Sequence, residues 1–507
     1  MYEVSNSIAR WASRSPERPA VIDELAALSY AELHERANRW AGALHEAGFH
    51  SGAGIIVLLP NRVECIEVMV ALFRADVVPF FLNTNVAKHK AEDLLGLAAA
   101  TEARLLITTR DVADEMAFSQ AEAPFQIWTV DDLDLSRQAI GEIPPPRHGT
   151  DMVLFTSGST GSPKGIILSK SAFDLGLQPN GEFVEPKQHL LVKPLASRGS
   201  ISTACNILQE GNTVVLSRVA TPDAWMKLME NHHISFVKLG PSELIGWLEH
   251  LERNGRGLPS SVRHIMSNGE PLTQALKARI GKLLPHIRVT DLYGTSEVGA
   301  ITMIEQKEWA LKDGSCGRPI FFVSLKIVGE QNEELPPGEI GEIWVKTRYR
   351  MKEYYQNAGA TNETIQGDYV KTGDLGFLDK QGYLYLRGRK QDVIRRGEHR
   401  IFPAEVEDVL REANGVEAAV VIGRNSPEHG QEPVAYILMR DSKLLSTEGE
   451  AVLRNDILAH CEERLASYQI PAEMWFVQEI PLNAAGKADR LALAQAAAAL
   501  QQKAEQS

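Results

Sequence analysis

The segment Leu154–Ile166, LFTSGSTGSPKGI, constrains the fold more than any other part of the chain. An apolar run that indicates a strand precedes the loop and a second apolar run follows it, whereas the residues between them are mainly glycines, small hydroxyl residues and one lysine. Glycine has no Cβ, so such a loop can turn tightly and point backbone N–H groups at an anion. A solvated linker has a similar composition but does not need two apolar flanks. The segment therefore predicts a polyphosphate-binding loop that contains Thr156, Ser157, Gly158, Ser159, Thr160, Gly161 and Lys164.

Two common nucleotide motifs are absent from this segment. No Gly-Lys-Ser/Thr ends the loop, so it is not a Walker A loop, and no GxGxxG indicates a dinucleotide fold. A kinase or NTPase of the P-loop class is therefore disfavoured.

Length, charge and cysteine spacing restrict the functional class further. A chain of 507 residues should form more than one domain. Its formal net charge of −13 disfavours a nucleic-acid partner, because such surfaces are usually basic. Its four cysteines lie far apart, which disfavours a disulfide framework or a zinc site. We see no signal peptide and no apolar run long enough to span a membrane, and we expect a cytoplasmic protein.

The order of apolar patterns predicts an α/β protein. Residues 29–48 repeat apolar side chains at helical spacing and end on Gly48, whereas residues 54–59 and 105–109 are short apolar runs typical of buried parallel strands. Such alternation predicts a large layered α/β domain with a mainly parallel sheet. From Gly338 onward, short strands with glycine turns indicate a β-rich subdomain. A small α/β module follows, and the predicted domains are residues 1–390 and 391–507.

The glycine loop resembles the phosphate-binding signature of the adenylate-forming superfamily, which includes acyl-CoA synthetases, peptide-synthetase adenylation domains and firefly-type luciferases. Further motifs of that superfamily follow in the expected order over nearly the whole chain: SNGEP at 267–271, YGTSE at 293–297, TGD at 372–374, GR at 388–389 and PLNAAGKADR at 481–490. The resemblance implies a large AMP-binding domain followed by a small, mobile C-terminal lid.

The resemblance also implies roles for the residues of the first two of these motifs. Tyr293 would stack on adenine, Thr295 would hydrogen-bond the α-phosphate, and Glu297 would hold magnesium, which prefers carboxylate and phosphate oxygens. The other nucleotide contacts of these two motifs would come from Asn268, Gly269, Glu270 and Gly294.

The later motifs would complete the nucleotide site and carry the hinge. Asp374 would accept hydrogen bonds from the ribose hydroxyls, and Arg389 would contact the ribose or a phosphate. Most relatives place an aspartate or lysine at the hinge, where this chain has Gln391 followed by Asp392. The exact pivot is therefore open.

Two residues of the predicted C-terminal domain would serve the two half-reactions. When a carboxylate attacks the α-phosphorus of ATP, charge builds on the phosphoryl oxygens and on the departing pyrophosphate, and Lys487 would stabilise it together with magnesium. The glycine loop around Gly397 would line the thiol tunnel.

The acid-binding segment departs from amino-acid-activating relatives. Their aspartate position corresponds here to Ser197, followed by Arg198, and no carboxylate occurs between residues 193 and 209, so an α-amino acid is disfavoured. Lys238 lies inside an apolar strand, where burial is costly unless the lysine is paired. The other residues expected to line the acyl pocket are Met266, Asn268, Leu292, Ala300 and Ile301.

Two interpretations of the basic residues stay open at this point. Lys238 could pair with Glu243 or another acid for structural reasons while Arg198 faces solvent. Alternatively, Lys238 and Arg198 form a cationic end of the pocket that binds a second anionic or polar group of the acid, as on a small dicarboxylate.

The sequence thus predicts an ATP- and Mg²⁺-dependent enzyme that converts a carboxylic acid to an acyl-adenylate and then to a coenzyme A thioester. An alternative is a stand-alone adenylation enzyme that loads a carrier-protein phosphopantetheine. An inactive nucleotide-binding relative is a third alternative, which the presence of Lys487 and Glu297 disfavours.

Overall fold

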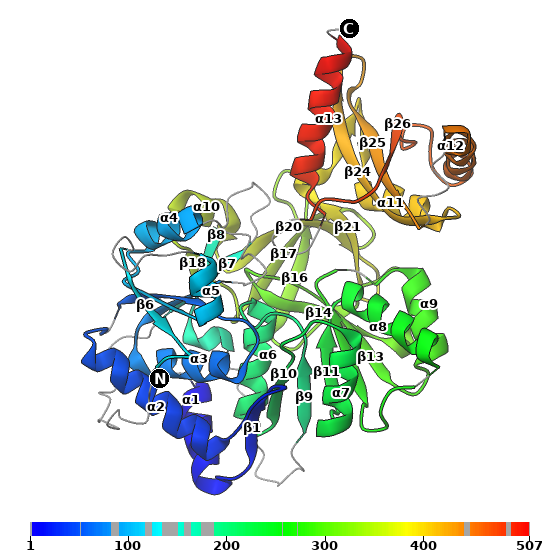
Figure 1. Cartoon of the computed structure of the whole chain (residues 1–507). Helices are drawn as coiled ribbons and strands as arrows, with labels where there is room; N and C mark the ends of the chain where they lie inside the picture. The colour runs from blue at the N-terminus through cyan, green and yellow to red at the C-terminus, as the bar shows by residue number, and fades with distance from the viewer. Residues whose placement is uncertain are drawn as a thin grey trace. The chain divides into compact units, whose positions relative to one another are not determined.

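The computed structural model describes residues 3–50, 52–82, 91–116, 124–133, 151–156, 164–173, 187–255, 257–270, 272–440, 447–482 and 488–505. Its contacts divide the chain into two compact units (Figure 1). Unit 1 comprises Met1–Thr156, Pro163–Ser324 and Val345–Val370; unit 2 comprises Ser157–Ser162, Leu325–Trp344 and Lys371–Ser507. The predicted domain boundary at 390/391 lies inside unit 2 and stays a prediction.

Unit 1 contains a nine-stranded sheet whose central strands are parallel. In spatial order its strands are β15 (Arg318–Pro319), β14 (Gly299–Glu305), β13 (Arg288–Thr295), β12 (His264–Asn268), β11 (Phe236–Leu239), β9 (Gln188–Leu191), β10 (Thr213–Leu216), β1 (Pro19–Ile22) and β2 (Ala27–Ser29).

A second sheet of unit 1 has seven strands and is also mainly parallel. Its order is β18 (Glu353–Tyr354), β8 (Lys164–Leu168), β7 (Met152–Thr156), β4 (Val78–Phe81), β3 (Gly54–Leu58), β5 (Leu105–Thr108) and β6 (Gln126–Thr129). The two sheets confirm the predicted layered α/β fold with mainly parallel strands.

Helices pack on these sheets and form a shared core. Side chains of α1, α2, α3 and α6 join both sheets in one buried apolar cluster, and α4 packs on the opposite face of the seven-stranded sheet. The helices are α1 (Glu3–Arg14), α2 (Tyr30–Glu46), α3 (Val63–Ala75), α4 (Ala91–Thr101), α5 (Arg110–Glu115), α6 (Arg198–Gln209), α7 (Pro222–His232), α8 (Pro241–Asn254), α9 (Gln274–Leu283) and α10 (Ala358–Thr364).

Local sequence signals set several helix ends. Ser29 and Glu32 form a capping box at the start of α2, which accounts for the predicted helix there. The helix ends at Glu46, so the predicted cap at Gly48 lies just beyond its true cap, Ala47.

No helix in the described ranges is long and apolar enough to cross a membrane.

A third sheet contains the predicted β-rich segment, and the division between the units runs through several of its strands. Its order is β16 (Val323–Val328), β17 (Gly341–Thr347), β20 (Tyr369–Leu378) and β19 (Ile365–Gln366), with β21 (Leu384–Arg389) paired to β20.

The rest of unit 2 is a small α/β module, as predicted. Its sheet has the order β23 (His399–Ile401), β22 (Ile394–Arg396), β25 (Gly430–Met439) and β24 (Val416–Ser426), with β26 (Glu473–Val477) parallel to β25. Around it lie α11 (Pro403–Glu412), α12 (Thr447–Glu462) and α13 (Arg490–Glu505). Apolar side chains of α11 and α12 form one buried cluster with residues of this sheet. Those of α13 form a second cluster with other residues of the same sheet.

Candidate active site

The flanks of the predicted phosphate loop form a hairpin. Strands β7 and β8 are antiparallel and end with Thr156 opposite Lys164. Residues 157–163, which hold Ser157, Gly158, Ser159, Thr160 and Gly161, lie outside the described residues. The structure thus places the two ends of the loop side by side, while the ligand contacts of the loop stay predictions.

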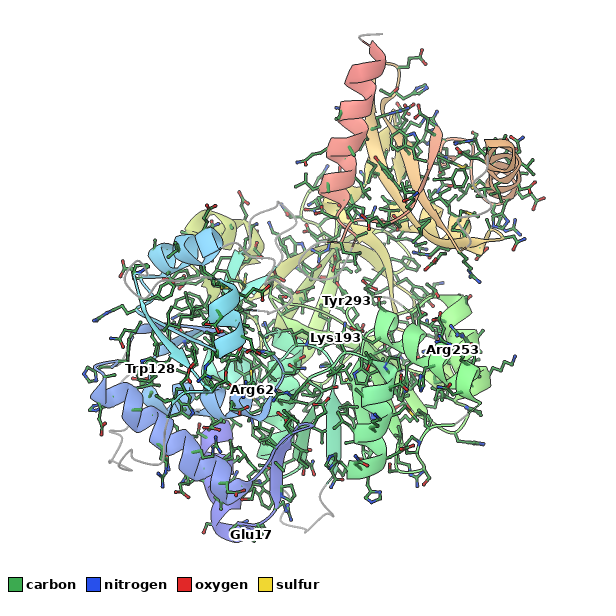
Figure 2. The ribbon with its side chains drawn as sticks, viewed as in Figure 1. Glu17, Arg62, Trp128, Lys193, Arg253 and Tyr293 are labelled. Atoms are coloured by element: carbon green, nitrogen blue, oxygen red, sulfur yellow. The ribbon has the colours of Figure 1, made fainter. Side chains whose placement is uncertain are left out.

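The carboxyl ends of parallel strands β9, β11, β12 and β13 bring together most of the other predicted residues of unit 1. Lys238 lies opposite Met266, and Asn268 lies opposite Leu292. Ligands of open α/β sheets bind outside this edge. Lys193, just after β9, and Tyr293, near the end of β13, also lie at this edge and are labelled in Figure 2.

Lys238 is buried against the start of α6. It is 8% exposed, and its Nζ donates to the Gly199 carbonyl (2.9 Å) and to Thr203 Oγ1 (2.6 Å). Burial, and secondarily the charge of Lys193, lower its pKa from 10.5 to about 8. Within the described ranges it forms no ion pair, so the expected structural partner Glu243 is not its partner.

Glu243 instead interacts with its own helix start and with Lys193. It accepts a hydrogen bond from Gly240 N (2.8 Å) and lies 3.8 Å from Lys193 Nζ. Lys193 also donates to the Asn268 carbonyl (3.2 Å). Gly269, with a φ of +107°, leaves room for this lysine, since a Cβ there would lie 3.0 Å from Nζ.

Arg198 does not face solvent, which excludes one half of the structural interpretation. It is 6% exposed and donates to the backbone carbonyls of Ser296 and Tyr349. Burial lowers its pKa to about 10, and the nearby carboxylate of Glu297 partly opposes that effect. Arg198 therefore ties the start of α6 to the YGTSE turn and to residue 349.

Ser197 is the N-cap of α6. Its hydroxyl accepts from Ser200 N and donates to Ser200 Oγ (3.0 Å), so it stabilises the helix that carries Arg198. Contact of Ser197 with the acid stays a prediction.

The YGTSE motif spans the end of β13 and the turn to β14. Gly294 is required by close packing, because a Cβ there would overlap the Gly299 carbonyl. The Glu297 carboxylate accepts a hydrogen bond from the Tyr354 hydroxyl (3.0 Å), and the Glu297 carbonyl accepts from Met351 N (2.6 Å). Both the backbone and the side chain of this glutamate are therefore held in place.

Several buried polar atoms of this region have no hydrogen-bond partner within the described ranges. Among them are Thr295 Oγ1, Ser267 Oγ, Asn268 Oδ1 and Arg198 Nε. Because buried polar atoms are nearly always paired in native proteins, such atoms at one strand edge indicate a place for a polar ligand or ordered water.

The predicted lining of the acyl pocket differs in exposure. Met266, Leu292 and Ala300 are partly exposed, as is Glu270, whereas Ile301 is completely buried. The sequence reasoning did not identify Lys193 or Tyr354 as site residues. Lys193 could have been found, because a lysine that follows an apolar parallel strand lies at the edge where ligands bind. No local motif points to Tyr354.

In unit 2, the predicted ribose-binding residues lie next to each other. Asp374 on β20 faces Arg389 on β21, and their side chains form an ion pair of 2.8 Å. Asp374 is buried, and its backbone N–H donates to Thr372 Oγ1 (3.1 Å). The two residues are thus brought together as the resemblance implied, while their contact with a ribose stays a prediction.

Lys487 lies in the segment 483–487, outside the described residues, but the chain on both sides of it is fixed. Leu482 and Ala488 form an antiparallel bridge. Arg490 then forms ion pairs with Glu407 (2.6 Å) and, more weakly, with Asp392 beside the predicted hinge (3.5 Å).

Gly397 forms the turn between β22 and β23 with Glu398, and its N–H donates to the His429 carbonyl (2.8 Å). Its place in a thiol tunnel stays a prediction.

The residues of unit 1 fit a magnesium nucleotide. Glu297 offers a hard carboxylate, and Thr295 offers a hydroxyl that has no hydrogen-bond partner among the described residues. Lys164 adds positive charge beside the ring of Tyr354, whose hydroxyl contacts Glu297, and Lys193 adds positive charge just after β9. Magnesium commonly binds one or two carboxylates together with phosphate oxygens and water. In the described ranges no group of three or more His, Cys, Asp and Glu residues could hold a metal ion by itself.

Comparison with known proteins identifies the family to which the chain belongs. The family description "AMP-binding enzyme" matches residues 8–355, and "AMP-binding enzyme C-terminal domain" matches residues 405–487. A 2-succinylbenzoate–CoA ligase of Bacillus cereus (strain AH820) is 30% identical over 98% of this chain and 99% of its own.

Two solved structures of o-succinylbenzoate coenzyme A synthetase from Bacillus subtilis are 28% identical. One, in complex with its acyl-adenylate intermediate, has a TM-score of 0.84 and covers 96% of this chain and 97% of its own. The other, in complex with ATP and magnesium, has a TM-score of 0.83 and covers 96% and 98%. The chain therefore belongs to the adenylate-forming family of AMP-binding enzymes.

Proposed function

We propose that this protein is an AMP-forming acid–thiol ligase that activates a small carboxylic acid with ATP and transfers the acyl group to coenzyme A. The observation that carries the proposal is a group of buried polar atoms that have no hydrogen-bond partner in the described part of the chain, among them Thr295 Oγ1, Ser267 Oγ, Asn268 Oδ1 and Arg198 Nε. A polar ligand at the carboxyl ends of the parallel strands would satisfy these groups.

In the first step the acid carboxylate attacks the α-phosphorus of ATP, an acyl-O–P bond forms, and pyrophosphate leaves with the electrons of the broken bond. Thr295 and the phosphate loop bind the phosphates, and Lys487 stabilises the charge that develops on them. Bound magnesium would supply further charge neutralisation at the phosphates, and Glu297 would hold it. Asp374 and Arg389 bind the ribose.

In the second step the thiol of coenzyme A loses its proton and attacks the acyl carbonyl, and AMP leaves as the thioester forms. Gly397 would line the path of the thiol. The relatives named above are coenzyme A ligases, and the acid in their names is 2-succinylbenzoate. We propose the same kind of acid as the substrate here.

The acid that fits best carries a second anionic group, as 2-succinylbenzoate does. Lys238 lies buried at the strand edge and has no acidic partner among the described residues, and Lys193 is close enough to lower its pKa. A second carboxylate on the substrate would pair with Lys238 and offset the cost of burying the lysine. Arg198 adds positive charge at the start of α6.

Pyrophosphate release tests the proposal. The wild-type enzyme is given ATP, Mg²⁺ and either 2-succinylbenzoate or 4-oxo-4-phenylbutanoate, a matched acid without the ring carboxylate, and each mixture then receives coenzyme A or a phosphopantetheinyl carrier protein. We expect pyrophosphate release with the dicarboxylate and a thioester only with coenzyme A. Thioester formation only on the carrier would favour the adenylation-enzyme alternative, and no pyrophosphate release with any acid would overturn the proposal.

A further inference from the structure

The segment around Tyr354 holds Glu297 from two directions. Met351 N donates to the Glu297 carbonyl (2.6 Å), and the Tyr354 hydroxyl donates to Glu297 Oε1 (3.0 Å). The backbone of Tyr354 is itself fixed, because β18 pairs with β8 and Tyr354 N donates to Thr361 Oγ1 (2.9 Å). The tyrosine hydroxyl therefore meets the carboxylate from a rigid position.

The same ring also contacts the lysine of the phosphate loop. Lys164 Nζ lies 5.5 Å from the centroid of the Tyr354 ring, within the range of a cation–π interaction. The ring is buried in the core that both sheets share. One side chain thus touches the predicted magnesium-holding carboxylate through its hydroxyl and the predicted phosphate-binding lysine through its face.

We propose that Tyr354 is a positioning residue that orients the Glu297 carboxylate for Mg²⁺ and sets Lys164 beside it. With Oε1 engaged by the tyrosine hydroxyl, Oε2 is the oxygen left for the metal. Groups that orient a metal-binding carboxylate by hydrogen bonding commonly change metal affinity about 10- to 100-fold when removed. The inference rests on the proposed function, because it needs Glu297 to hold the metal.

The test separates the hydroxyl from the ring. Tyr354→Phe keeps the buried ring and its contact with Lys164 but removes the donor to Glu297. The matched control is Tyr355→Phe, because the Tyr355 hydroxyl only approaches the Thr101 carbonyl (3.5 Å) and accepts from Gln356 (3.3 Å).

Binding of Mn²⁺, a spectroscopic substitute for Mg²⁺, is measured by electron paramagnetic resonance with a non-hydrolysable ATP analogue. We expect Tyr354→Phe to bind Mn²⁺ about tenfold more weakly, with unchanged affinity for the metal-free analogue, and Tyr355→Phe to match the wild type. The Mg²⁺ concentration for half-maximal pyrophosphate exchange should rise by the same factor. A purely structural tyrosine would lower thermal stability without this shift.

A double-mutant comparison distinguishes the failure of this inference from that of the proposed function. If Tyr354 acts through Glu297, its effect on Mn²⁺ affinity should disappear in the Glu297→Gln background. Normal Mn²⁺ binding by Tyr354→Phe beside weak binding by Glu297→Gln would overturn the inference alone. Normal binding by Glu297→Gln would remove the glutamate from the metal site and overturn the assignment on which the inference rests.

Discussion

Replacing Lys238 by methionine should change the pH dependence of acid activation. The pKa of Lys238 is about 8, so the lysine is mostly charged at pH 7 and about one tenth charged at pH 9. If its charge binds the second carboxylate of the acid, kcat/KM for a dicarboxylate should fall about tenfold from pH 7 to pH 9, because kcat/KM reports ionisations of the free enzyme. Lys238→Met should be slow at pH 7 and lack this decline.

ATP–pyrophosphate exchange is the suitable assay, because it follows adenylation and excludes titration of the coenzyme A thiol. The same profiles recorded with 4-oxo-4-phenylbutanoate should be parallel in both proteins, since that acid has no second carboxylate for the lysine to bind. Profiles of wild type and Lys238→Met that decline together on the dicarboxylate would refute the assignment of Lys238 to the substrate.

Three further substitutions address the nucleotide site. Asp374→Asn should raise KM for ATP about tenfold or more through weaker hydrogen bonds to the ribose, and an unchanged KM would remove Asp374 from the site. Lys487→Ala should slow pyrophosphate exchange about 10²- to 10³-fold while thioester formation from a supplied acyl-adenylate stays near normal; equal losses in both steps would contradict a role in adenylation only. Glu297→Gln should raise the Mg²⁺ requirement of exchange at least about tenfold, and a Mg²⁺ titration that matches the wild type would exclude it as a metal ligand.

Local patterns were sufficient for most of the fold. The helix over residues 30–46 could be predicted because Ser29 and Glu32 are a capping box followed by apolar residues at helical spacing. Short apolar runs such as residues 54–58 became buried parallel strands. Each of these signals involves residues that are close together in sequence. They can therefore be recognised without knowing the tertiary structure.

Side-chain partners could not be predicted in the same way. Arg198 was open to two interpretations, and its actual partners, the carbonyls of Ser296 and Tyr349, lie about 100 and 150 residues away in sequence. Backbone carbonyls have no residue-specific signature, so no sequence pattern points to them. Tyr354 was missed for a related reason, since its contact with Glu297 depends on the pairing of a two-residue strand with β8.

The environment of Lys238 argues that the lysine is there for a ligand. Lowering its pKa from 10.5 to about 8 corresponds to a cost of about 3 kcal/mol for keeping the charge in the folded protein at neutral pH. The carbonyl of Gly199 and the hydroxyl of Thr203 satisfy two of its three N–H donors but leave its charge without a counterion in the described ranges. A methionine would fill the same space between β11 and α6 without that cost. An anionic group on the substrate would supply the missing charge and oppose the effect of burial, which is the main cause of the lowered pKa.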